Sequence, residues 1–304
     1  MLVSICQNIH LSKRENKAMI TVFTPTYNRK DTLELLYNSL LKQQYKDFEW
    51  LIIDDGSTDN TKEYVESLIK KNKIKINYIY KENAGKMSAV NMAHQQAKGE
   101  SFITIDSDDE LSPDILKQLH EDYNLIKNNN RLAGIVYLAA SKKEPDKPIG
   151  SLLPEDKTIC KYTDLKTKYH ITGDKATLWK SKVLKKYAFP TITGEKFIPD
   201  AYLMMQISKD YQIMTLNRIV MLVEYQAAGL TNNYFNLVKN NPIGTSLYYK
   251  ELYYYDKNIY NIYGYLLFCF YGKKKMRQII TEHPAKILVI LLYIPVKIIF
   301  LIRR

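Results

Sequence analysis

Three aspartates stand close together in the segment FITIDSDDELSPD, which spans residues 102–114. Asp106, Asp108 and Asp109 follow a short apolar run, and carboxylates this close repel one another unless a cation or solvent offsets their charge. One interpretation is a solvated turn. The other is a site for a hard divalent cation, Mg²⁺ or Mn²⁺, which binds carboxylate oxygens together with substrate phosphates. The spacing alone does not decide between the two.

Polar residues also follow three earlier apolar runs. The polar segments are PTYN at 25–28, DDGS at 54–57, NAGK at 83–86 and DSDD at 106–109. Asp55 can accept a hydrogen bond from a base N–H or a sugar hydroxyl. Lys86 opens a predicted helix, whose N-terminus favours anions such as phosphate. A tight turn at Gly56 and a solvated lysine are the simpler alternatives.

Alternation of strands and helices over residues 20–140 predicts an α/β fold. Strands are expected at 20–23, 48–55, 76–81, 101–106 and 133–140, and helices at 31–44, 57–71, 86–97 and 112–126. Strands that are apolar on both faces indicate a mainly parallel sheet flanked by helices. Ligands of such sheets bind beyond the carboxyl ends of the strands, so the four polar segments are expected at one edge.

The rest of the chain has weaker periodicity. Residues 141–160 are rich in Pro, Lys and acids and indicate a surface connection. Helices are expected at 176–187 and 199–211 and a strand at 218–226, which together form a mixed subdomain closing over the sheet edge. The predicted organisation is a domain over 19–235, with halves 19–140 and 141–235, and a C-terminal region over 236–304.

The C-terminal region carries most of the net charge. Residues 239–304 contain eleven basic and three acidic residues, whereas the whole chain has a net charge of +12. The stretch 285–302 is apolar, contains Pro295, and is at the short limit for a membrane span. A helix lying on an anionic membrane surface is the favoured interpretation, rather than nucleic-acid binding. A spanning helix and a helix buried in the protein or an oligomer are the alternatives.

Localisation is expected to be cytoplasmic. Cys6, Cys160 and Cys269 lie far apart in the sequence and form no disulfide framework or zinc-ligand spacing. Residues 1–19 have no apolar core long enough for a signal peptide, and Met19 is an alternative start.

Three segments, read in order, resemble the family 2 glycosyltransferases. They are TVFTPTYNRKDTLELLYNSLLKQQYKDFEWLIIDDGSTDNT, KENAGKMSAVNMAHQQAKGE and FITIDSDDELSPD, within residues 19–140. Members of this family of the bacterial surface-polysaccharide type are inverting enzymes of the GT-A fold that use nucleotide-sugars. The resemblance implies a GT-A fold, a mixed acceptor subdomain and a helical C-terminal tail here.

The resemblance also implies roles for individual residues. Pro25, Thr26 and Tyr27 match the loop beside the nucleotide, Asp55 the acid that accepts the N3–H of a uracil-like base, and Lys86 the basic position near the base or phosphates. Asp106 matches the first acid of a DxD motif, near the ribose, and Asp108 the last, which binds the metal; Asp109 supports it.

An inverting transfer also needs a general base, and the resemblance places Asp200 in that position. Pro199 stands where the family often has Glu, which leaves Glu195 as a minor rival. The simpler interpretation of Asp200 is a helix N-cap or first-turn acid.

The sequence thus predicts an inverting hexosyl- or N-acetylhexosaminyltransferase that uses Mn²⁺ or Mg²⁺. Its donor is a nucleotide-sugar, with a UDP-sugar favoured, and its acceptor is a glycan or lipid-linked hydroxyl. It would lie peripherally on the cytoplasmic side of the cell membrane. The alternative is a catalytically inactive nucleotide-sugar binder or membrane scaffold.

Overall fold

The computed structural model describes residues 20–224 and 234–302. The predictions about residues 1–19 and about the end of the strand expected at 218–226 therefore lie outside the described residues, as do residues 225–233 of the domain predicted over 19–235.

One sheet of ten strands forms the centre of the protein. The strands are β1 Ile20–Thr26, β2 Phe48–Asp54, β3 Ile76–Tyr80, β4 Ser101–Thr104, β5 Glu110–Leu111, β6 Leu132–Ser141, β7 Glu144–Pro148, β8 Ile159–Cys160, β9 Lys175–Lys180 and β10 Gln212–Val223. The order along the sheet is β3-β2-β1-β4-β9-β6-β10-β5. Strands β3, β2, β1 and β4 are parallel to one another, as are β6 and β10. Strands β5, β7, β8 and β9 pair antiparallel with their neighbours, so the sheet is mixed, with the predicted parallel arrangement in its first four strands.

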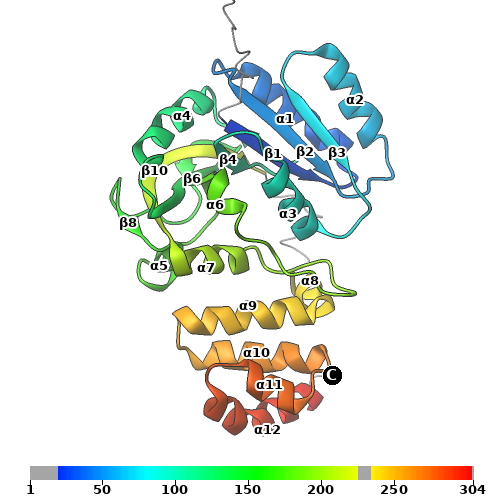
Figure 1. Cartoon of the computed structure of the whole chain (residues 1–304), viewed down its shortest axis with the longest axis vertical. Helices are drawn as coiled ribbons and strands as arrows, with labels where there is room; N and C mark the ends of the chain where they lie inside the picture. The colour runs from blue at the N-terminus through cyan, green and yellow to red at the C-terminus, as the bar shows by residue number, and fades with distance from the viewer. Residues whose placement is uncertain (1–19, 225–233, 303–304) are drawn as a thin grey trace, which may run out of the picture.

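Helices cover both faces of this sheet (Figure 1). They are α1 Lys30–Lys42, α2 Thr61–Lys71, α3 Lys86–Gln96, α4 Ile115–Ile126, α5 Tyr162–Thr167, α6 Ser181–Leu184 and α7 Ala201–Asp210. Buried residues of α1, α2 and α4 form one core with the sheet, whereas those of α3, α5, α6 and α7 form a second core on the other face. The two cores explain why the central strands are apolar on both faces.

The C-terminal region is helical and continues the molecule below the sheet (Figure 1). Its helices are α8 Tyr234–Asn240, α9 Pro242–Tyr255, α10 Ile259–Tyr271, α11 Met276–Glu282 and α12 Lys286–Ile302. A third core joins α9, α10, α11 and α12, with Tyr265 and Val289 fully buried. Within residues 20–224 and 234–302, none of the helices has the length and apolar character needed to cross a membrane.

The helix predicted over 176–187 is wrong for its first half. Residues Lys175–Lys180 form β9, which lies antiparallel between β4 and β6, and only Ser181–Leu184 are helical. Leu178 and Trp179 are both buried although they point to opposite faces, so the segment has no alternating pattern. A short apolar run of this kind fits a buried strand as well as a helix, and strand pairing decides the outcome.

Candidate functional site

The carboxyl ends of the four parallel strands meet at one edge of the sheet. Thr26 pairs with Asp54, and Asp54 pairs with Tyr80, so β1, β2 and β3 end side by side. Pro25 and Thr26 are the last residues of β1, and Tyr27, which follows them, is 48% exposed. The structure therefore brings together the first three polar segments, as the sequence predicts.

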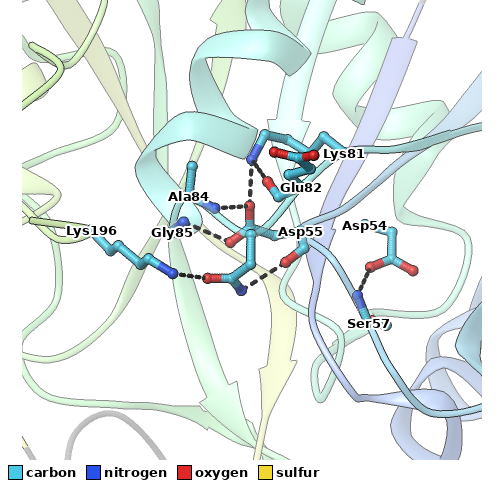
Figure 2. Close-up of polar contacts among 9 residues, drawn as sticks. Asp54, Asp55, Ser57, Lys81, Glu82, Ala84, Gly85 and Lys196 are labelled. Atoms are coloured by element: carbon cyan, nitrogen blue, oxygen red, sulfur yellow. Dashed lines mark hydrogen bonds and ion pairs between the residues drawn. The ribbon is translucent and has the colours of Figure 1, made fainter. Parts of the chain in front are cut away.

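Asp55 is fixed by three hydrogen bonds (Figure 2). Its Oδ1 accepts from Lys81 Nζ at 2.6 Å and from the Ala84 amide at 3.0 Å, and its Oδ2 accepts from the Gly85 amide at 2.7 Å. The side chains of Asp55 and Lys81 are 6% and 11% exposed. The carboxylate therefore holds the loop before α3 in place. Oδ1 already accepts two hydrogen bonds, whereas Oδ2 accepts one and keeps a lone pair for a further donor.

Lys86 is the first residue of α3 and reaches the fourth polar segment. Its Nζ donates to Asp106 Oδ2 at 2.9 Å. Burial alone lowers the pKa of the Lys86 ammonium, but the carboxylates of Asp106, Asp200 and Asp108 reverse this effect, and the net pKa is raised. Lys86 thus lies in the combined field of both predicted DxD acids and the predicted base.

The DxD segment concentrates negative charge. Asp106 Oδ1 is buried and has no hydrogen-bond partner among the residues that the structure describes. Burial, together with the carboxylates of Asp106 and Asp108, raises the pKa of the Asp109 carboxyl to about 8. The basic groups nearby are Arg29, whose Nη1 lies 3.8 Å from Asp108 Oδ2, and Lys142, whose Nζ donates to the Asp108 carbonyl at 3.0 Å.

The acids of this segment supply too few ligands for a divalent cation on their own, so substrate phosphates would have to complete its coordination. No group of three or more His, Cys, Asp and Glu side chains is placed to hold a metal ion within residues 20–224 and 234–302. The unpartnered oxygen of Asp106 and the repulsion around Asp109 nevertheless fit a cation that takes its remaining ligands from phosphates.

Asp200 lies directly before α7, and its side chain makes no capping hydrogen bond to that helix in the described chain. The N-cap interpretation therefore lacks its defining contact. Burial raises the pKa of the Asp200 carboxyl; Lys86 lowers it in part and Asp106 raises it further. By its accessible surface the residue as a whole is exposed, although many protein atoms surround its carboxyl group. It is thus an available proton acceptor in the field of the DxD segment.

Glu195, the rival for the base, is occupied elsewhere. Its Oε1 accepts from the Ile243 amide at 2.7 Å and its Oε2 from the Gly244 amide at 2.8 Å, both in the first turn of α9. Both oxygens of this carboxylate are therefore engaged in holding the N-terminus of α9.

A cavity of about 320 Å³ lies beside the start of α7. Its walls come from α5, α7 and α9; they are mainly apolar and include Tyr162, Ala201, Tyr248 and Tyr255. Tyr162 also stacks on Trp179 at 6.0 Å between ring centroids. The cavity therefore borders the residue that follows Asp200.

Sequence reasoning missed several residues that shape this edge. They are Arg29, Lys81, Lys142 and Lys196. Only Lys81 carried a usable signal, because it directly follows the third strand on the same edge as Asp55.

A family model and several known proteins are similar to this chain. The model described as Glycosyl transferase family 2 matches residues 21–183, more than half of the chain. The poly(ribitol-phosphate) beta-N-acetylglucosaminyltransferase TarS of Staphylococcus aureus is 35% identical over 116 residues, which is 35% of this chain but only 20% of TarS. The putative teichuronic acid biosynthesis glycosyltransferase TuaG of Bacillus subtilis is 35% identical over 34% of this chain and 40% of its own length.

A third relative matches nearly end to end. The GalNAc(5)-diNAcBac-PP-undecaprenol beta-1,3-glucosyltransferase of Campylobacter jejuni is 27% identical over 91% of this chain and 94% of its own length. Among solved structures, S. aureus TarS 1-349 in complex with UDP-GlcNAc has a TM-score of 0.62 at 21% identity, covering 85% of this chain and 77% of that one. This similarity confirms the predicted GT-A fold with its helical C-terminal region.

Proposed function

Because this chain belongs to glycosyltransferase family 2, we propose that it transfers a sugar from a UDP-sugar to a hydroxyl of a glycan or lipid-linked acceptor, with inversion at the anomeric carbon. The convergence of Lys86, Asp106, Asp108 and Asp200 in one field carries the proposal. The complex of TarS with UDP-GlcNAc and the undecaprenol-linked acceptor named for the C. jejuni relative support the choice of donor and acceptor.

The donor would lie along the edge formed by β1, β2 and β4. Asp55 accepts from the base N–H, beside Pro25, Thr26 and Tyr27, and Lys86 offers an ammonium to the diphosphate. Thr26 Oγ1, like the Asp106 carboxylate oxygen described above, is buried without a partner among the described residues. Buried polar atoms without partners are costly, and a polar ligand at this edge removes that cost.

Asp108 and Asp106 would hold a divalent cation, Mn²⁺ or Mg²⁺, with Asp109 in support. When bound, such an ion neutralises the charge that develops on the leaving diphosphate. The carboxylates supply the negative field that attracts the ion, while Arg29 and Lys142 limit the repulsion when it is absent.

Asp200 would act as the general base. It removes the proton of the attacking acceptor hydroxyl while that oxygen forms the new bond to the anomeric carbon from the face opposite the leaving group. A raised pKa improves a carboxylate as a proton acceptor, provided that Lys86 keeps part of it ionised. The cavity bordered by Tyr162 and Ala201 provides an aromatic surface for the acceptor.

Nucleoside diphosphate release tests this proposal. The purified protein is given a panel of nucleotide-sugars with a lipid-linked glycan acceptor and Mn²⁺ or Mg²⁺, with and without EDTA. We expect release with a UDP-sugar and its loss in EDTA. Asp200→Asn should lower transfer by about 10²–10⁴-fold while leaving UDP affinity within about twofold. Asp108→Asn should abolish activity, so that added metal or EDTA no longer changes nucleoside diphosphate release.

Asp146→Asn, on the exposed strand β7, is the matched control and should be silent. Nucleotide binding without release under any condition would favour the inactive binder. Absence of both binding and release would favour the scaffold and refute the transferase proposal.

We also propose that α12 holds the protein on the cytoplasmic face of the membrane. Its outer face exposes Ile287, Leu291 and Ile294 at 75%, 65% and 66%, while Val289 and Val296 are buried against α10 and α11. An apolar face of this size rarely stays in water. The adjoining basic residues are Lys273, Lys275, Arg277, Lys286 and Lys297, which suit anionic lipid headgroups.

Vesicle sedimentation tests the membrane proposal. The wild-type protein should bind phosphatidylglycerol-containing vesicles more tightly than phosphatidylcholine vesicles. The double variant Leu291→Glu/Ile294→Glu should weaken binding at least about tenfold, because two exposed apolar side chains that would enter the membrane are replaced by anions. The control Leu125→Glu/Leu152→Glu changes two leucines outside α12 that are 49% and 60% exposed, and it should bind as the wild type does. Equal binding of both double variants would contradict membrane attachment through α12.

A further inference from the structure

The segment 195–198, just before Asp200, is packed tightly between two helix starts. A Cβ atom built on Gly85, the residue before α3, would lie 2.0 Å from the Lys196 carbonyl oxygen. A Cβ atom built on Gly244, in the first turn of α9, would lie 2.6 Å from the Phe197 carbonyl oxygen. Both glycines therefore allow backbone to lie directly against this segment.

On the nucleotide side, hydrogen bonds connect the segment to Asp55. Lys196 Nζ donates to Asn83 Oδ1 at 2.6 Å, and Asn83 Nδ2 donates to the carbonyl oxygen of Asp55 at 2.7 Å (Figure 2). The Asp55 carboxylate binds the Ala84 and Gly85 amides of the same loop. A shift of the 83–85 loop would therefore change the hydrogen bonds of both Asp55 and Lys196.

On the other side, the segment is bound to α9. Glu195 accepts the Ile243 and Gly244 amides, an arrangement that a helix N-terminus favours for a carboxylate. In the reverse direction, Asn241 Oδ1 accepts the Lys196 amide at 2.8 Å and the Phe197 amide at 3.1 Å. These four bonds join the two backbones in register.

We propose that Glu195 and Lys196 are positioning residues for sugar transfer: they fix the segment that carries Asp200 between the nucleotide edge and the first turn of α9. This inference rests on the proposed function, since it assumes Asp200 as the base. Pro199, between the segment and Asp200, has a fixed φ and transmits the position of the one to the other. The C-terminal helices thereby serve catalysis as well as attachment.

Steady-state kinetics of the full chain separates the two residues. Glu195→Ala should lower kcat about ten- to a hundred-fold, the cost of a displacement of the base of about 1 Å, and leave UDP affinity within about twofold. Glu195→Gln keeps one acceptor oxygen and should recover part of the loss. Lys196→Met should lower kcat and also weaken UDP binding, because Asn83 loses its donor.

Glu282→Ala is the matched control, since Glu282 pairs with Lys274 at 2.7 Å in the same C-terminal region, away from the 195–198 segment. Asn241→Ala removes the opposite pair of bonds and should also lower kcat. If Glu195→Ala does not fold, Glu195→Gln and Asn241→Ala decide the question.

Variants at Glu195 and Asn241 that bind UDP and turn over like Glu282→Ala would overturn the inference. That result leaves the proposed function intact as long as the wild-type enzyme is active. A wild-type protein that releases no nucleoside diphosphate would instead refute the proposed function itself.

Discussion

Replacing Gly85 with alanine should displace the 195–198 segment, and the structure sets the size of the effect. Gly85 has a φ of 91°, in the left-handed region that side chains rarely adopt. The added Cβ would also lie 2.0 Å from the Lys196 carbonyl oxygen and 2.8 Å from its carbonyl carbon. Because Cβ contacts below 3.0 Å are essentially absent from proteins, one of the two backbones must move by about 1 Å.

Two contributions lower the free energy of unfolding of the Gly85→Ala variant. The positive φ alone costs about 1–2 kcal/mol for a residue other than glycine. Movement of Gly85 also weakens the 2.7 Å bond from its amide to Asp55, and a hydrogen bond to a charged group is worth about 1.5–3 kcal/mol. We therefore expect Gly85→Ala to lower the free energy of unfolding by about 2–5 kcal/mol and to lower kcat by at least about tenfold.

Gly194→Ala separates backbone strain from collision. Gly194 has a φ of 81°, but a Cβ atom built on it meets no atom within 4 Å. It should lose only about 1–2 kcal/mol of stability and keep its kcat. Urea denaturation and steady-state transfer measure both variants. Equal stability and equal kcat for Gly85→Ala and Gly194→Ala would refute the close packing of α3 against the 195–198 segment.

Two further predictions concern stability. Burial lowers the pKa of His94 to about 4 from an ordinary 6.5. Between these two pH values the unfolded chain therefore binds more protons than the folded one. The free energy of unfolding should fall by up to about 3 kcal/mol as the pH drops from 6.5 to 4. His94→Gln should flatten this dependence in urea titrations at pH 7 and 4.5; an unchanged pH slope would contradict it. Arg218 pairs with the buried Asp122, so Arg218→Met should lower the free energy of unfolding of the protein by about 1–3 kcal/mol. Adding Asp122→Asn should restore part of this loss. If calorimetry finds no recovery, the unpaired charge of Asp122 is not the cause.

The nucleotide edge was predictable because each of its parts has a local signal. A strand that is apolar on both faces followed at once by polar residues marks the carboxyl end of a parallel strand. Asp55 and Asp106 both stand at such ends, and the sheet order places them on one edge. The grouping of Asp106, Asp108 and Asp109 was likewise visible, whereas the burial that raises the pKa of Asp109 is seen only in the fold.

Strand β9 and the surroundings of Asp200 lack such signals. Residues Lys175–Lys180 are apolar on both faces and directly precede a helical turn, so their strand conformation depends on pairing with β4 and β6. Lys196 contacts Asn83 across 113 positions of the sequence. No periodicity or spacing encodes a contact of that range. Only the fold shows that Glu195 binds the N-terminus of a helix.

The C-terminal region has two physical roles. From the sequence only the apolar stretch 285–302 stands apart, and nothing distinguishes the contacts of α9. In the fold, α9 binds the catalytic domain: Tyr255 donates to the Met205 carbonyl at 2.6 Å, and Glu251 pairs with Lys209 at 2.8 Å.

Helix α12 instead buries one narrow stripe and leaves the rest of its apolar surface exposed. Removing it would uncover Tyr265 and Ile279 in the third core. Because this core also contains residues of α10 and α9, its loss would also disturb the packing of α9 against the 195–198 segment. Loss of activity in a truncated chain would therefore not report membrane attachment. Substitutions confined to the outer face of α12 separate the two roles, because the side chains of Ile287, Leu291 and Ile294 are at least 65% exposed.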